Sequence, residues 1–110
     1  MQLKFGDYEE GSGAELLCPR CDCNYLHHDQ VDVYERSEDA TTGMHVNVCD
    51  GRAVVNTDLH GNPSSRRHGL SIGLWCEGCH AKLLLTFAQH KGVTLVNIVD
   101  TGEDIEGVEA

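Results

Sequence analysis

The sequence is poor in basic residues and contains no long apolar run. Its 110 residues include 8 lysines and arginines against 18 aspartates and glutamates, which gives a formal net charge of -10. A protein that binds nucleic-acid phosphates regardless of base sequence needs a positive surface, so this balance argues against that class. No segment approaches the roughly 20 apolar residues of a membrane-spanning helix, and the first residues lack the apolar core of a signal peptide. We therefore expect a cytosolic (cytoplasmic) protein without a membrane segment.

The acidic residues are concentrated at the two ends of the chain. Residues 1–17 and 100–110 are rich in glycine and acidic side chains and poor in large apolar ones. Such segments bury too little apolar surface to become ordered, so we predict that both are mobile tails. Residues 18–99 are only mildly acidic and form the single predicted domain, of a size at which a metal ion adds much to a modest hydrophobic core.

Alternation of apolar and polar residues predicts β-strands in this domain. Residues 31–35 and 44–49 alternate, and the second run ends at an Asp-Gly pair, positions 50–51, which is a strong signal for a two-residue hairpin. That turn places Val48 opposite Ala53, so the apolar side chains of the hairpin share one face. No segment shows the apolar repeat of a substantial helix, and we predict an all-β fold with very little helix.

A second antiparallel element follows a long loop. Residues 70–74 alternate, and residues 82–89 and 93–99 form a predicted hairpin in which Phe87 lies opposite Val96. Both faces of this element carry apolar residues. Because a sheet that is apolar on both faces is normally covered on both, we expect the first hairpin to pack against it and complete a small two-layer domain.

Four of the six cysteines form two closely spaced pairs, in Cys18-Pro19-Arg20-Cys21 and Cys76-Glu77-Gly78-Cys79. Together they supply the four thiolates of a tetrahedral structural zinc site. Without a secretory signal, metal ligation is favoured over disulfides. The segment between the pairs is about three times as long as the roughly 15 to 20 residues of ordinary zinc ribbons. Closing the longer loop costs only about 1 kcal/mol more, against roughly 10 to 16 kcal/mol from zinc binding. We therefore predict one Zn²⁺ bound by Cys18, Cys21, Cys76 and Cys79.

Neighbouring residues offer alternatives to these ligands. Cys23 could replace Cys21, lie beside the site, or have no role, although the equal spacing of the two pairs favours Cys21. His80, next to Cys79, is a further candidate ligand. A thioredoxin-like redox role for the first pair would need a helix after it, and none is indicated. Cys49 lies far along the chain from both pairs and is expected to be a lone thiol.

The arrangement of a CPxC turn, an intervening β region and a CxxC that leads into a hairpin resembles the zinc ribbons. The resemblance covers residues 18–99 loosely and is specific at the four cysteines. More narrowly, residues 26–28, 62–70 and 89–94 look like small zinc-ribbon proteins of actinobacteria and their phages. This resemblance implies a bacterial or phage cytosolic setting and no defined activity. Asp22 departs from the family, because ribbons often have glycine there to present backbone N–H groups to sulfur.

The one basic cluster of the sequence suggests a partner-binding patch. Arg66, Arg67 and His68 lie on the loop between the hairpins, and Lys91 at the tip of the second hairpin extends the patch. Adjacent arginines can form forked bonds to phosphates or carboxylates. The alternative is pairing within the chain, with Glu35, Glu38 or Asp39 as the acidic groups. The leading hypothesis is a non-enzymatic zinc-binding interaction module that binds another protein, as a host-directed or counter-defence factor if a phage encodes it.

Two other functions remain open. A nucleic-acid-binding ribbon would use Arg66, Arg67 and Lys91, with Trp75 or Tyr25 stacking on bases. A metal-dependent hydrolase would need a second metal site with a free coordination position. The available ligands for such a site are His27, His28, Asp29, Glu35, Glu38, Asp39, His45, His68 and His90.

Overall fold

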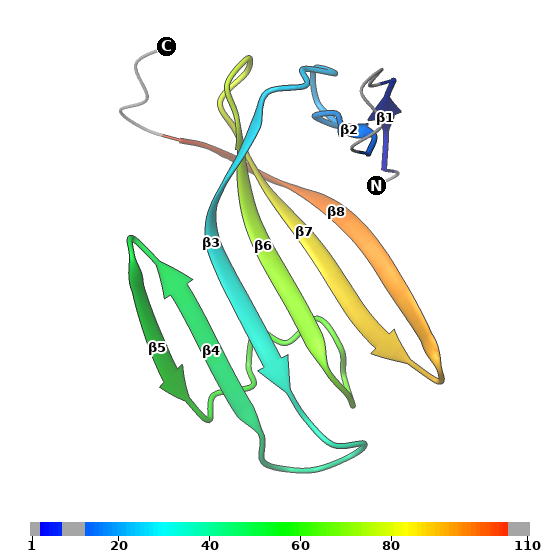
Figure 1. The fold of residues 1–110 in the computed structure, drawn as a ribbon, viewed down its shortest axis with the longest axis vertical. Helices are drawn as coiled ribbons and strands as arrows, with labels where there is room; N and C mark the ends of the chain where they lie inside the picture. Colours follow the sequence, from blue (N-terminus) through cyan, green and yellow to red (C-terminus); the bar gives the residue numbers. More distant parts are fainter. Residues whose placement is uncertain (1–2, 8–12, 106–110) are drawn as a thin grey trace.

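A computed structural model describes residues 3–7 and 13–105 of the chain (Figure 1). The described residues form strands and turns without a helix, and hence include no helix long and apolar enough to cross a membrane. The predicted all-β class is confirmed. A two-stranded sheet joins β1 (Phe5–Gly6) and β2 (Glu15–Leu16). A six-stranded sheet contains β3 (Leu26–Glu35), β4 (Met44–Cys49), β5 (Arg52–Asn56), β6 (Gly69–Cys76), β7 (Ala81–His90) and β8 (Val93–Asp104).

Both predicted hairpins form around two-residue turns. Asp50 and Gly51 have φ angles of 52° and 76°, and Lys91 and Gly92 have φ angles of 49° and 84°. Two successive left-handed residues are typical of the turn whose twist matches that of antiparallel strands. The predicted cross-strand pairs Val48–Ala53 and Phe87–Val96 are confirmed, and Val46–Val55 and Leu85–Ile98 pair in the same two registers.

The two hairpins belong to one sheet and are not stacked in two layers. β3 pairs antiparallel with β4 along one edge and with β6 along the other, so the strand order is β5-β4-β3-β6-β7-β8. The predicted two-layer packing is therefore wrong. β3 is ten residues long, and pairing at both of its edges satisfies backbone groups that a stacked arrangement would leave open on one side. The first hairpin thus widens the sheet instead of covering it.

Part of each expected tail forms a strand. β1 and β2 lie within residues 1–17, where the Leu17 N–H donates to the Lys4 carbonyl oxygen at 2.9 Å. β8 continues to Asp104, past the expected boundary at residue 99. Arg20 forms ion pairs with Asp100 and Asp104, and these hold this end of β8 in place. Residues 1–2, 8–12 and 106–110 of the expected tails lie outside the described residues.

The register places two rows of apolar residues across one face of the six-stranded sheet. Each row contains one residue from each strand. On the opposite face, the positions between the rows are mostly polar, including Asp32, Asn47, Ser71 and Thr86. The first row consists of Val55, Val46, Val33, Leu70, Phe87 and Val96, and the second row consists of Ala53, Val48, Val31, Ile72, Leu85 and Ile98.

The core occupies only one end of this face. Its buried cluster includes Cys18, Cys76, Ala81, Leu83 and Ile98, each at most 1% exposed. Figure 1 shows the β1–β2 unit at this end of the sheet, near β8 and the turn between β6 and β7. Side chains of the N-terminal segment that pack against the cluster are Leu3, Leu16 and Cys23. We call this part of the molecule the clamped end.

Candidate metal centre

Two turns of the same conformation present the two cysteine pairs. The Asp22 N–H donates to the Cys18 carbonyl oxygen at 2.9 Å, and the His80 N–H donates to the Cys76 carbonyl oxygen at 2.9 Å. Asp22 and His80 have φ angles of 63° and 61°, so each occupies the left-handed position of its own turn. Aspartate and histidine are among the non-glycine residues that adopt this conformation most readily. The missing glycine at Asp22 therefore leaves the turn intact.

The four sulfur atoms of the predicted ligands lie together. The Sγ atoms of Cys18 and Cys79 are 3.7 Å apart, and those of Cys21 and Cys76 are 3.5 Å apart. All four ligand atoms lie within 4.8 Å of one another. A tetrahedral ion with bonds to sulfur of about 2.3 Å separates its ligands by about 3.8 Å. The arrangement therefore fits a tetrahedral metal ion, and the four cysteines could hold one.

The electrostatics of the cluster favour a bound cation. Burial raises the pKa of the Cys76 thiol, and contacts with the Cys21 and Cys18 sulfurs raise it further, while the backbone N–H groups of Cys79 and Gly78 oppose the rise. Burial also raises the pKa of Cys79. Four thiolates this close together need a counter-charge, and a metal ion that replaces the thiol protons would supply it.

Cys18 differs from Cys76 and Cys79 in the direction of its pKa shift. Burial by itself raises the pKa of its thiol, but hydrogen bonds from the backbone N–H groups of Cys21 and Arg20, and contacts with neighbouring sulfurs, outweigh this effect. The pKa of Cys18 therefore lies below its ordinary value. Backbone donors of this kind orient sulfur ligands and stabilise their charge when a metal ion is bound.

Arg20, inside the first cysteine pair, fastens the end of β8 to the metal centre. Its Nε and Nη2 atoms donate to the two carboxylate oxygens of Asp100 at 2.8 and 2.7 Å, and its Nη1 atom donates to Asp104 at 2.6 Å. Arg20, together with the Gly102 N–H, holds the pKa of Asp100 at about 2. The Ile105 N–H also donates to the His80 carbonyl oxygen at 2.9 Å. β8 is thus tied to both cysteine turns.

This clamp was not predicted, because the acidic end of the chain was expected to be a mobile tail. Its only signal was an arginine inside a cysteine pair together with two aspartates four positions apart, at 100 and 104. Neither feature indicates that the two segments meet. The contact depends on β7 returning β8 to the metal end of the sheet.

The remaining cysteines lie outside the sulfur cluster. The Sγ atom of Cys23 accepts a hydrogen bond from the Tyr25 N–H at 3.4 Å, and its side chain packs against the buried core. Cys21, and not Cys23, belongs to the group of four that could hold an ion. Cys49 lies on β4 opposite Arg52. Burial and the charge of Asp50 raise the pKa of Cys49, as expected for an unreactive lone thiol.

The histidines are dispersed. Within the part of the chain that the structure describes, the four cysteines are the only group of three or more possible ligands close enough to hold an ion. The second metal site required by a hydrolase is therefore not assembled from these residues. Three histidines lie beside single carboxylates: His27 by Glu77, His45 by Asp32, and His68 by Glu35.

The two arginines of the predicted partner-binding patch are engaged within the chain. Arg66 donates from Nε and Nη2 to the two oxygens of Asp39, and Arg67 donates from Nη2 to Glu38. Asp39 and Glu38 are among the acidic residues with which pairing inside the chain was predicted as the alternative to partner binding. Lys91 is exposed in the β7–β8 turn. Partner binding by this patch stays a prediction.

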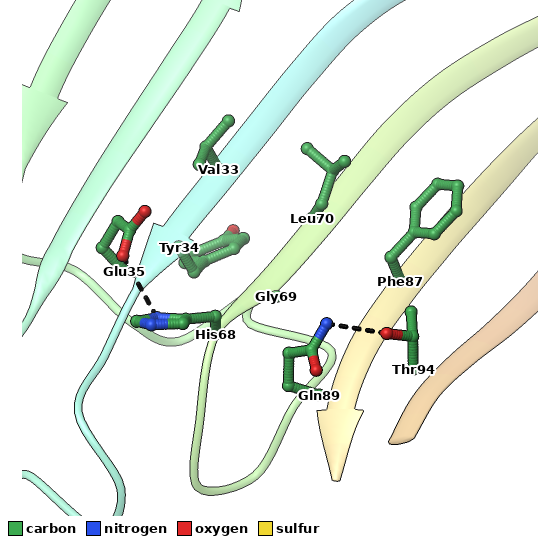
Figure 2. Close-up of a pocket in the computed structure, with 9 residues that line it drawn as sticks. All are labelled: Val33, Tyr34, Glu35, His68, Gly69, Leu70, Phe87, Gln89 and Thr94. Atoms are coloured by element: carbon green, nitrogen blue, oxygen red, sulfur yellow. Dashed lines mark hydrogen bonds and ion pairs between the residues drawn. The ribbon is translucent and has the colours of Figure 1, made fainter. Parts of the chain in front are cut away.

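A pocket of about 350 Å³ lies on the face that carries the apolar rows, away from the metal centre. Figure 2 shows Val33, Leu70 and Phe87, from three adjacent strands, along one side of it. At its border, Gln89 donates to the Thr94 hydroxyl at 2.9 Å. The remaining lining residues are Tyr34, Glu35, His68 and Gly69. The pocket could not be predicted from the sequence, because it requires β3, β6 and β7 to be neighbours.

No similarity to a known protein adds to this description of the site. The chain matches no protein-family model, and no curated protein and no solved structure is significantly similar to it. What the chain shares with zinc ribbons is a four-cysteine site formed by two short-spaced pairs.

Proposed function

We propose that this protein is a non-enzymatic, zinc-stabilised module that binds a protein partner through the open part of its sheet. The observation that carries the proposal is the first row, which remains solvent-accessible across all six strands. Its end members Val55 and Val96 are 63% and 42% exposed, and its other members are half-buried. Continuous exposed apolar surface of this kind is typical of interaction sites.

The chemistry of the metal centre supports a structural ion. A tetrahedral set of four sulfurs takes zinc or iron. Four protein ligands leave no open position for water or substrate, as in structural zinc sites. The clamped end then has the role of a scaffold, since the ion joins both cysteine turns to the strands that also carry the apolar rows.

The basic patch has a secondary role in this proposal. His68 lines the pocket beside Val33, Leu70 and Phe87 of the first row, so the patch borders the apolar surface. Arg66 and Arg67 already bind carboxylates of the same chain, and a nucleic-acid phosphate would have to displace Asp39 and Glu38. These ion pairs weigh against nucleic-acid binding. In this proposal the apolar centre of the surface supplies the affinity, and its polar border restricts the choice of partner.

Metal analysis and site-specific crosslinking test the proposal together. We expect one zinc per chain in the purified full-length protein, and iron instead of zinc would overturn the zinc assignment. A photoreactive residue at Val55 should crosslink to a protein in the native cells. The same residue at Val54 is the control, because Val54 is 52% exposed but lies on the opposite face of β5. Equal crosslinking at both positions, or none at Val55, would contradict the proposal.

A further inference from the structure

We propose that the occupant of the open face is a second copy of this chain, so that two sheets pack face to face through their apolar rows. The proposal rests on the proposed function, because it names the protein that the open face binds. It commits to one surface, which consists of the first row, the accessible part of the second row, and the pocket residues Gln89 and Thr94 on the other side of the first row. We call this surface the open face.

The open face has the size that a symmetric dimer needs. Six strands span about 24 Å at about 4.8 Å per spacing, and the surface from the second row to the pocket residues Gln89 and Thr94 extends about 15 to 20 Å along the strands. The face therefore covers roughly 400 Å² in projection. The corrugated side-chain surface is larger than its projection, so two copies bury on the order of 1,000 Å², which is the size of a weak, reversible interface.

Charge decides which surface two such chains can share. Each chain has a formal net charge of -10, so most of its surface would repel a second copy. The two rows contain no charged residue. The acidic side chains that border them on the same face are Glu35, beside His68, and Asp100, which binds Arg20. His68 Nδ1 accepts a hydrogen bond from the Arg36 N–H, so it does not neutralise Glu35. Two copies can therefore meet through the two rows while Glu35 stays at the border of the interface.

The shape of the sheet also fits a second copy. A sheet with a continuous apolar face normally packs against another layer, and here the first hairpin extends the sheet instead of supplying that layer. Two copies of one sheet have the same twist, which allows the aligned packing of β-sandwiches. The same patch then serves both chains, as twofold symmetry requires. The pocket beside Val33, Leu70 and Phe87 adds a hollow that a side chain of the second copy can enter.

Light scattering of the full-length, zinc-loaded protein tests the proposal directly. We expect a mass of about 24 kDa, twice the 12.1 kDa of one chain, that falls toward the single-chain value on dilution. A mass of one chain at every concentration up to the solubility limit would overturn the proposal, whatever the variants do.

Matched variants locate the interface. Val55→Asp with Val96→Asp places two carboxylates on the open face, one in each edge strand. Val54→Asp with Leu95→Asp places two on the opposite face of the same strands, at positions that are 52% exposed. We expect the first double variant to be monomeric and the second to remain dimeric, both with one zinc per chain. Dissociation of the second but not the first would overturn the proposal.

A milder pair of substitutions tests the interface with less risk of misfolding, because it adds no charge. Val55→Thr with Val96→Thr keeps the shape and the β-branched character of both residues, and should raise the dimer Kd by roughly tenfold or more. An unchanged Kd would place the interface elsewhere and contradict the proposal.

The crosslinking experiment separates this inference from the proposed function. A monomer whose position 55 crosslinks to a different protein overturns the second-copy occupant and leaves the proposed function standing. A crosslink between two copies that the open-face variants abolish supports both. A monomer that crosslinks to nothing at position 55 contradicts both.

Discussion

The clamped end and the open face use the same strands in opposite ways. At the clamped end, β6, β7 and β8 are covered by the N-terminal segment and joined to it by the cysteine turns, and Leu83 and Ile98 are 1% exposed. Two residues before Ile98 on the same face of β8, Val96 is 42% exposed. One apolar face therefore passes from core to surface within a single strand. Burial is concentrated near the sulfur cluster, and the remainder of the face is partly exposed to solvent.

The largest effect should follow from removing a sulfur ligand. We expect Cys79→Ser to unfold the domain, because a structural zinc site supplies roughly 10 to 16 kcal/mol in small proteins and a domain has only about 5 to 15 kcal/mol of net stability. Circular dichroism and zinc content measure the result. Cys49→Ser is the control, since this thiol lies outside the cluster, and it should keep one zinc and the wild-type melt. A folded, cooperative Cys79→Ser protein would show that the clamped end does not depend on the ion.

The second largest effect should come from truncating a core side chain, and it should distinguish the clamped end from the open face. Ile98→Ala leaves a cavity at the clamped end and should lower the free energy of unfolding by about 2 to 5 kcal/mol. Val96→Ala, on the same face of the same strand, should cost less than about 1 kcal/mol in dilute protein, because its side chain is already exposed to water. Urea denaturation at low protein concentration measures both. Equal costs would mean that the open face is covered within a single chain.

Loosening the end of β8 should have a local effect. Arg20→Ala removes the forked bond to Asp100 and the bond to Asp104, so amide hydrogen exchange over residues 100–104 should accelerate by roughly tenfold or more. Zinc content should not change, because the sulfur ligands remain. Arg20→Lys keeps the charge without the fork and should give an intermediate rate. Unchanged exchange in Arg20→Ala would show that the hydrogen bond from Ile105 to His80 holds this segment without the arginine.

The smallest effect should come from the basic loop. Arg66→Ala with Arg67→Ala removes ion pairs that lie near the surface, and such pairs contribute little to stability. The melt should stay close to that of the wild type. If the patch only borders the open face, dimer formation and crosslinking at position 55 should both persist. Complete loss of crosslinking would show that the arginines, and not the apolar rows, make the main contribution to binding.

Much of the secondary structure and the choice of the four cysteines that cluster could be predicted from local signals. The Asp-Gly turn at 50–51 fixed the register of the first hairpin, and the equal spacing of the cysteine pairs selected Cys21 over Cys23. The Arg20 clamp and the pocket could not be predicted in this way. Each depends on segments that are distant in the sequence, and neither side of such a contact carries a distinctive pattern.

The sequence by itself determined the strands, the tight turns and the four sulfur donors, because side-chain alternation and turn chemistry act over a few residues. Only the tertiary structure decided that β3 joins both hairpins into one sheet, and hence that the apolar rows form a continuous, partly uncovered face. The physical reason is that every free strand edge offers the same backbone donors and acceptors. The choice between widening a sheet and covering it is therefore made by long-range pairing, and the alternating sequence of each strand is compatible with both.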